Sequence, residues 1–161
     1  MAALSWACGS ASPRQKAAVV RAFVTRPPKD TVRFTAPAIA SQCVGGVGHG
    51  FLFRGSSGGD GAILWLRTPD SLALGTWPLV QRGDTVSLRG GTVGVRFMVG
   101  EVAYGVALDS GAVTVTALRP SVMLVVRGAG LAVSAAGRVT AEVAFDAVPV
   151  GADTVSCRSR P

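Results

Sequence analysis

The stretch Gly61-Ala-Ile-Leu-Trp-Leu-Arg67, followed at a short distance by Gly75-Thr-Trp-Pro-Leu79, contains the pattern from which the fold is predicted. In an extended strand, the even-numbered residues of the first stretch point to one side, and Ile63 and Trp65 point to the other. Both sides are apolar. We therefore expect this strand to be covered on both faces and to lie in the middle of a sheet.

The chain after residue 29 consists of short alternating segments separated by turn residues. Val93 to Val99 and Val139 to Phe145 place apolar residues at every second position, and 21 Gly and 9 Pro supply the turns. We count about ten such segments, at the spacing of a sandwich or barrel and with no helical pattern between them. The sequence therefore predicts an all-β fold, an antiparallel two-sheet β-sandwich, with a closed β-barrel as the alternative.

The net charge of +7 is concentrated at the start of the chain. Residues 1–29 contain five basic residues and no acid, whereas eleven arginines and all nine acids follow. Arg26-Pro-Pro-Lys29 interrupts any preceding element, because neither proline can donate a backbone hydrogen bond. We therefore predict a basic, partly disordered leader or tether at 1–29 and a single β-sandwich domain at 30–161.

The arginines of the predicted domain are spaced singly rather than clustered with aromatic residues. A nucleic-acid-binding face would carry clustered basic residues, so we expect no nucleic-acid partner. The hydrophobic fraction is 48%, but no apolar run approaches the about 20 residues of a membrane-spanning helix.

The segment Leu4-Ser-Trp-Ala-Cys8-Gly-Ser10 resembles the end of a bacterial lipoprotein signal, in which a small residue precedes a cysteine that is then acylated. Ala7 and Cys8 are the matching residues. The resemblance implies an exported protein of the bacterial cell envelope or periplasm, tethered to the membrane by a lipid on Cys8. The acid-free start, rich in Arg, Ser and Ala, also fits an organellar transit peptide or the disordered tail of a cytoplasmic protein.

Two further cysteines occur at opposite ends of the predicted domain. Cys43 lies early in the fold, and Cys157 lies in its last strand. We predict a disulfide between them, which would join the first strands to the last and would require an oxidising compartment. The alternative is a pair of buried free thiols in a cytosolic protein.

Catalytic and metal-binding patterns are weak in this sequence. His49 is the only histidine and follows a glycine-rich turn, and no Gly-x-Ser-x-Gly motif is present. One histidine and three scattered cysteines cannot form a tetrahedral zinc site unaided. We therefore predict no catalytic residue, metal or cofactor, and the sequence favours a protein that is not an enzyme. A hydrolase with paired carboxylates is the less favoured alternative.

Trp77 and Tyr104 are the candidate ligand-binding residues, as aromatic side chains on which a sugar or another small molecule could stack. Trp77 stands beside a proline at a predicted edge, whereas Trp65 is expected in the core. The function that we predict is an interaction or structural role in the cell envelope, with an unknown protein or envelope component as partner. A small-ligand or carbohydrate-binding module is the alternative.

Overall fold

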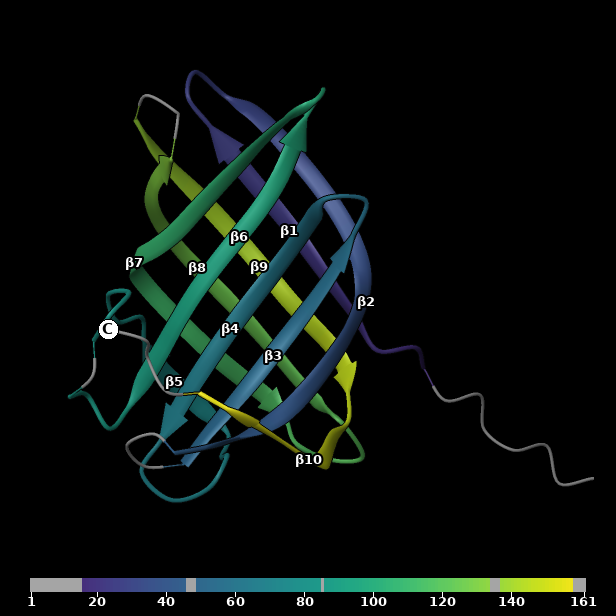
Figure 1. Ribbon diagram of the computed structural model, residues 1–161, viewed down its shortest axis with the longest axis vertical. Helices are drawn as coiled ribbons and strands as arrows, with labels where there is room; N and C mark the ends of the chain where they lie inside the picture. Colours follow the sequence, from purple (N-terminus) through teal and green to yellow (C-terminus); the bar gives the residue numbers. More distant parts are fainter. Residues whose placement is uncertain (1–15, 46–48, 85, 134–136, 158–161) are drawn as a thin grey trace, which may run out of the picture.

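The computed structural model describes residues 16–45, 49–84, 86–133 and 137–157. These residues form ten β-strands, so the predicted all-β class is confirmed (Figure 1). The strands are β1 (Val19–Arg26), β2 (Asp30–Val44), β3 (His49–Ser57), β4 (Asp60–Thr68), β5 (Gly75–Pro78), β6 (Gly90–Val99), β7 (Val102–Ala117), β8 (Val122–Val133), β9 (Arg138–Val148) and β10 (Val150–Ser156). No helix long and apolar enough to cross a membrane occurs among the described residues.

Eight of the strands form one closed antiparallel barrel. Their order is β1, β9, β8, β7, β6, β4, β3, β2, and β2 pairs again with β1. The predicted two-sheet sandwich is therefore wrong, and the alternative, a closed barrel, is correct. Both folds bury every second residue of each strand, so the alternating pattern predicts the buried faces without showing whether the sheet closes.

Two long strands replace the interrupted strands that the sequence predicts. β2 continues through Pro37, which pairs with Val19 at the very start of β1 and therefore lies at the end of that ladder. The amide of Ala38 then donates to the carbonyl of Ala18 at 3.0 Å. β7 continues through Asp109-Ser-Gly111, residue types typical of a turn, by means of a bulge between Leu108 and Ser110. Each long strand can thus pair with different neighbours along its length.

The inward side chains pack into one core. Phe53, Phe97 and Phe145 are each 0% exposed and belong to this core. An eight-stranded barrel has an interior just wide enough for side chains to fill. The barrel interior is therefore occupied by the protein's own aromatic and aliphatic groups.

β4, the strand predicted to lie in the middle of a sheet, pairs with β3 on one side and β6 on the other, which confirms its position. Its inward residues Leu64 and Leu66 are fully buried, but Ile63 on the outer face is 45% exposed. The expectation that both faces are covered is therefore wrong. A closed barrel covers only the inner face of each strand.

The predicted domain boundary at residue 29 is also wrong. β1 pairs with both β2 and β9, and its inward residues Val20, Ala22 and Val24 are almost completely buried. The prolines that follow β1 lie in the tight connection to β2 rather than between a leader and a domain. The barrel therefore includes part of the predicted 1–29 leader, of which residues 1–15 lie outside the described residues.

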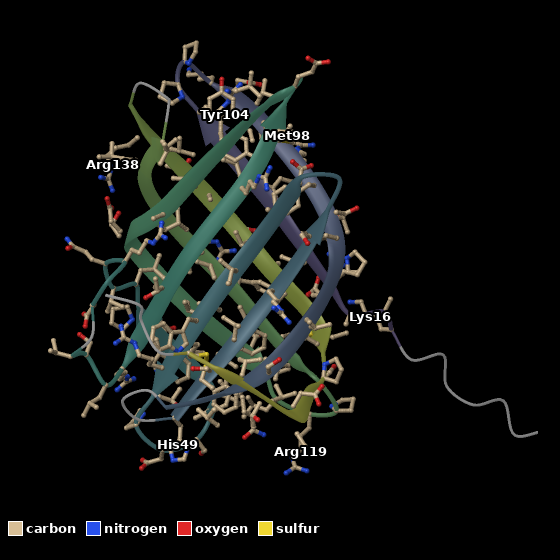
Figure 2. The ribbon with its side chains drawn as sticks, in the orientation of Figure 1. Lys16, His49, Met98, Tyr104, Arg119 and Arg138 are labelled. Carbon is tan, nitrogen blue, oxygen red and sulfur yellow. A yellow bond between two sulfur atoms is a disulfide. The ribbon has the colours of Figure 1, made fainter. Side chains whose placement is uncertain are left out.

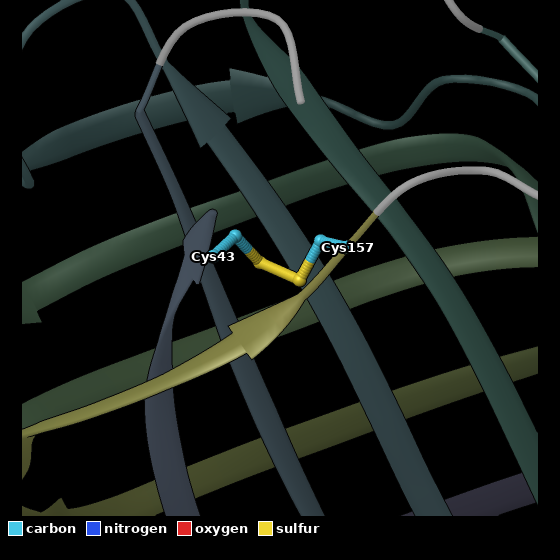
Figure 3. Close-up of a disulfide and its surroundings, with 2 residues drawn as sticks. All are labelled: Cys43 and Cys157. Atoms are coloured by element: carbon cyan, nitrogen blue, oxygen red, sulfur yellow. A yellow bond between two sulfur atoms is a disulfide. The ribbon is translucent and has the colours of Figure 1, made fainter. Parts of the chain in front are cut away.

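Two short strands extend the barrel at one end. β5 pairs with the second half of β7, and β10 runs parallel to the end of β2 (Figure 1). The sulfur atoms of Cys43 and Cys157 lie 2.01 Å apart, and their Cα atoms 5.2 Å apart, so the predicted disulfide pair is confirmed. The bond joins β2 to the residue after β10 (Figure 3).

The barrel core generates a first prediction. Phe97→Ala or Phe145→Ala should lower the free energy of unfolding by about 3–5 kcal/mol, because each leaves a cavity among fully buried side chains. Thr140→Ala, on the exposed outer face of β9, should cost about 0.5 kcal/mol or less. Chemical denaturation of the three variants measures both effects. Equal losses at Phe145 and Thr140 would contradict the assignment of the two faces.

The disulfide generates a second prediction. Cys43 and Cys157 are 114 residues apart, and a bond that closes so long a loop stabilises the fold by about 5 kcal/mol in the chain-entropy model. Reduction should therefore lower the urea midpoint of the wild-type protein. The double variant Cys43→Ala/Cys157→Ala should unfold at the midpoint of the reduced protein with or without reductant. A wild-type midpoint that reductant leaves unchanged would show that the bond adds no stability.

Candidate functional site

The outer face of the barrel carries an open groove that crosses β3, β4, β6 and β7 and encloses about 1440 Å³. β3, β4 and β6 form the face turned toward the viewer in Figure 1. The floor of the groove consists of residues with little or no side chain, Gly61, Gly94, Gly105 and Ala107. Its walls include Ile63 on one side and Leu131 on the other.

The register of the strands explains why the floor is low. Ile63 pairs with Gly94, Gly94 with Ala107, and Ala107 with Leu131, so the four residues form one row across the sheet. Neighbouring strands lie about 4.8 Å apart, which places the Cα atoms of Ile63 and Leu131 about 14 Å apart. A Cβ atom added to Gly105 would meet no heavy atom within 4 Å. The surface above Gly105 is therefore open, whereas a Cβ atom added to Gly94 would lie 3.2 Å from Cγ2 of Ile63.

The walls are apolar and exposed. Ile39 is 52% exposed, Leu131 62% and Val133 72%, and all three line the groove together with Ile63. Exposed apolar side chains that occur singly need no explanation, but a contiguous group around a depression is typical of a binding surface. The groove can therefore remove apolar parts of a ligand from water.

Trp65 borders one end of the groove and is half-buried on the outer face of β4. Its expected place in the core is wrong, because odd-numbered residues of β4 point outward. The guanidinium carbon of Arg67 lies 5.0 Å from the centroid of the Trp65 ring, within the range of a cation–π interaction. The indole is thereby held in place beside the groove.

Arg67 is only 1% exposed, although it also lies on the outer face of β4. Its Nη1 atom lies 3.7 Å from Oδ1 of Asp84, in the loop between β5 and β6. The Asp84 carboxylate accepts hydrogen bonds from the hydroxyl of Ser87 at 2.6 Å and from the amides of Ser87 and Val86. These hydrogen bonds, those from Ser87 foremost, and the charge of Arg67 together lower the pKa of Asp84 to about 2. The pair holds this loop against the barrel, where Arg82 lines the groove.

Charged side chains at the groove differ in whether a hydrogen-bond or ion-pair partner lies beside them. The carboxylate of Asp60 accepts the amide of Met98 at 2.7 Å. The arginines that line the groove, Arg54, Arg82 and Arg96, have no carboxylate within 4.0 Å among the described residues. Asp84, the other acid of the lining, is matched by Arg67. The groove therefore presents an excess of positive charge beside an apolar floor.

The predicted ligand-binding residues lie elsewhere. Trp77 is 4% exposed and packs in the core through β5, so its expected exposure is wrong. Tyr104 is half-buried near the opposite end of the barrel (Figure 2), where its ring stacks on Phe97 with centroids 5.6 Å apart. The guanidinium carbon of Arg26 lies 5.2 Å from the Tyr104 ring, and the hydrogen bond with Asp30 is the main cause that raises the Arg26 pKa. The structure does not bring Trp77 and Tyr104 together.

Two further residues considered from the sequence are His49 and Cys8. His49 is exposed at the start of β3, and Cys8 lies outside the described residues. Within the described ranges, no three His, Cys, Asp or Glu residues come close enough to hold a metal ion. Sequence reasoning missed the groove itself. The available signal was glycine at outward positions of well-alternated strands, at Gly94 between Val93 and Val95 and at Gly105 beside Val106.

The groove must be interpreted from its own chemistry. No family model, curated protein or solved structure matches this chain. What the geometry offers is an apolar depression of ligand size, three arginines at its margin and a fixed indole at one end. Depressions that are mostly apolar, with a few polar groups that fix orientation, are the usual form of small-molecule sites.

The Asp84 contacts generate a pH prediction. Because folding lowers the Asp84 pKa from 3.8 to about 2, the ionised carboxylate stabilises the fold above about pH 4, and this stabilisation is lost as the pH falls toward 2. Asp84→Asn should therefore lose less stability than the wild type between pH 5 and pH 2, as measured by urea midpoints at each pH. The control Asp153→Asn, at an exposed position of β10, should follow the wild-type curve. Parallel curves for wild type and Asp84→Asn would contradict this role.

Proposed function

We propose that the protein is a small-ligand-binding module whose ligand lies in the outer groove. The observation that carries this proposal is the glycine floor between exposed apolar walls, at Gly94 and Gly105 between Ile63 and Leu131. Glycine is unfavourable in a strand interior, because it adds backbone entropy to the unfolded chain and contributes no packing. Its presence at neighbouring outward positions is explained if a ligand approaches the backbone there.

The filled core supports an outer rather than an inner site. Barrels that hold ligands inside need an interior that side chains leave empty, and here the large side chains Phe53, Phe97 and Phe145 are directed inward and fully buried. A ligand inside the barrel would have to displace them. The outer groove requires no such displacement.

The polar groups at the groove favour binding over catalysis. A general acid or base must be free to exchange a proton with a bound substrate. The two acids of the lining, Asp60 and Asp84, already accept backbone amides. Arginine remains protonated at any physiological pH and therefore serves to orient a ligand rather than to transfer protons.

We also infer that the protein works in an oxidising, extracytoplasmic compartment. The Cys43–Cys157 bond supports this inference, because disulfides persist mainly outside the reducing cytosol. The narrower location in a bacterial envelope, with a lipid on Cys8, rests on the resemblance of the N-terminal segment to a lipoprotein signal. In that setting the groove would face a medium from which small molecules are collected.

A neutral fluorescent probe tests the binding function. N-phenylnaphthylamine, which fluoresces in apolar surroundings, should bind the wild-type protein in a saturable manner. Gly105→Ile should weaken this binding by about tenfold or more, because its Cβ atom meets no heavy atom within 4 Å and the side chain then projects over the groove floor. Thr140→Ile places the same side chain on the exposed outer face of β9 and should bind like the wild type.

Three outcomes would contradict the proposal. The first is a probe that fails to bind the folded wild-type protein, and the second is a probe that binds Gly105→Ile as tightly as the wild type. Binding that Thr140→Ile weakens to the same degree would indicate general adhesion to the barrel surface. Unchanged circular dichroism spectra and urea midpoints show that both variants fold like the wild type.

A further inference from the structure

We propose that the ligand of the groove is a flat apolar molecule that carries one carboxylate or sulfonate group, and that Arg54 and Arg96 receive this anion. The inference rests on the proposed function and adds the chemical class of the ligand. It depends on the positions of the two arginines relative to the glycine floor, and on which arginines of the barrel surface form ion pairs with carboxylates.

Arg96 has unusual freedom on the outer face of β6. It is exposed, and its partners across both neighbouring strands are glycines, Gly61 on β4 and Gly105 on β7. A strand residue usually has a side chain beside it on each neighbouring strand. Because Arg96 has none on either side, its guanidinium can reach across the groove floor in both directions.

Arg54 approaches the same place from the other side of β4. It is exposed on β3 and pairs with Ile63, whereas Arg96 pairs with Gly61, two residues earlier on β4. The strands β3 and β6 lie two strand spacings apart, about 10 Å. Two long side chains that reach inward from these strands can therefore meet one anionic group above Gly61.

The pattern of ion pairs favours an anion from outside the protein. Arg26, Arg127 and Arg138 pair with Asp30, Glu142 and Asp109, respectively. Arg54 and Arg96 have no such partner within 4.0 Å in the part of the chain that the structure describes. The Asp60 carboxylate, which also lines the groove, accepts the Met98 amide. The guanidinium groups of Arg54 and Arg96 match a carboxylate or sulfonate group in charge and in geometry.

The shape of the groove favours a flat body for the ligand. Its floor combines Gly94, Gly105 and Ala107 on two neighbouring strands with Arg96 beside them, and the Cα atoms of Ile63 and Leu131 lie about 14 Å apart across it. A ring system can lie flat on such a floor, with its edges against the aliphatic walls. The groove is recessed between these walls, which favours a free molecule over a bilayer surface.

Two dyes with the same aromatic body test the inference. Anilinonaphthalene sulfonate carries a sulfonate that N-phenylnaphthylamine lacks. We expect the sulfonate to bind wild-type protein about tenfold more tightly than the neutral dye. The double variant Arg54→Met/Arg96→Met keeps most of the apolar side-chain length and removes both charges. It should bind the two dyes with equal affinity, because the preference for the sulfonate is lost.

Arg119→Met supplies the matched control, because Arg119 is exposed at the end of the barrel opposite Tyr104 and does not line the groove (Figure 2). This variant should retain the wild-type preference for the sulfonate. A preference that survives in Arg54→Met/Arg96→Met, or that Arg119→Met also abolishes, overturns the assignment of the anion to Arg54 and Arg96.

The two proposals fail in different ways. If the neutral dye binds in the groove and the sulfonate binds no more tightly, the anion inference is wrong and the binding function stands. If neither dye binds, both are wrong. If the wild-type protein co-sediments with phosphatidylglycerol vesicles and Arg54→Met/Arg96→Met does not, the groove is a membrane-binding face and the proposal of a free ligand is wrong. If the wild-type protein does not co-sediment with the vesicles, the proposal of a free ligand is supported.

Discussion

The antiparallel pairing of β1 with β2 closes the sheet, and the separation of inner from outer side chains follows from that closure. Eight residue pairs, from Val19 with Pro37 to Arg26 with Asp30, make up this ladder. Because β1 also pairs with β9, the sheet has no free edge around the barrel. Each strand then has one face in the core and one face on the surface, and the described residues form no second sheet that could cover the outside.

Closure places the functional chemistry on the outer face. An eight-stranded barrel leaves room for side chains in its interior, and the inward phenylalanines, leucines and valines take up that room. A site for another molecule must then lie on the outer face of the barrel, where side chains are absent or stand far apart. Glycines at outward positions of β4, β6 and β7 create the depression, and the pair of Arg67 and Asp84 fixes the loop at one end of it.

Much of the fold can be predicted from the sequence, since period-two alternation depends only on which residues are apolar. The inward faces of β6 and β9 are predicted in this way. The pairing of Cys43 with Cys157 is predicted from the placement of the two cysteines at opposite ends of the fold. Closure is not predictable, because it depends on the pairing of β1 with β9, two strands from opposite ends of the sequence. A proline normally ends a strand, yet Pro37 is tolerated because it lies opposite the first residue of β1.

The candidate site is predicted less well for a related reason. The local pattern predicts Trp65 in the core and Trp77 at an exposed edge, but the burial of each depends on what covers its strand, which local sequence does not show. β5 lies alongside β7 and packs Trp77 into the core, whereas the outer face of β4 leaves Trp65 half-buried beside the groove. The glycine floor arises only when Gly61, Gly94 and Gly105 come together around Arg96 on three adjacent strands.

The central claim is that this barrel binds its ligand on the outer face while its interior stays filled. Nuclear Overhauser effects between N-phenylnaphthylamine and the methyl groups of the protein test this claim most directly. The account predicts contacts with the methyl groups of Ile63 and Leu131, which line the outer groove. Contacts with the methyl groups of Leu64 and Leu108, which are 0% and 1% exposed inside the barrel, would contradict it.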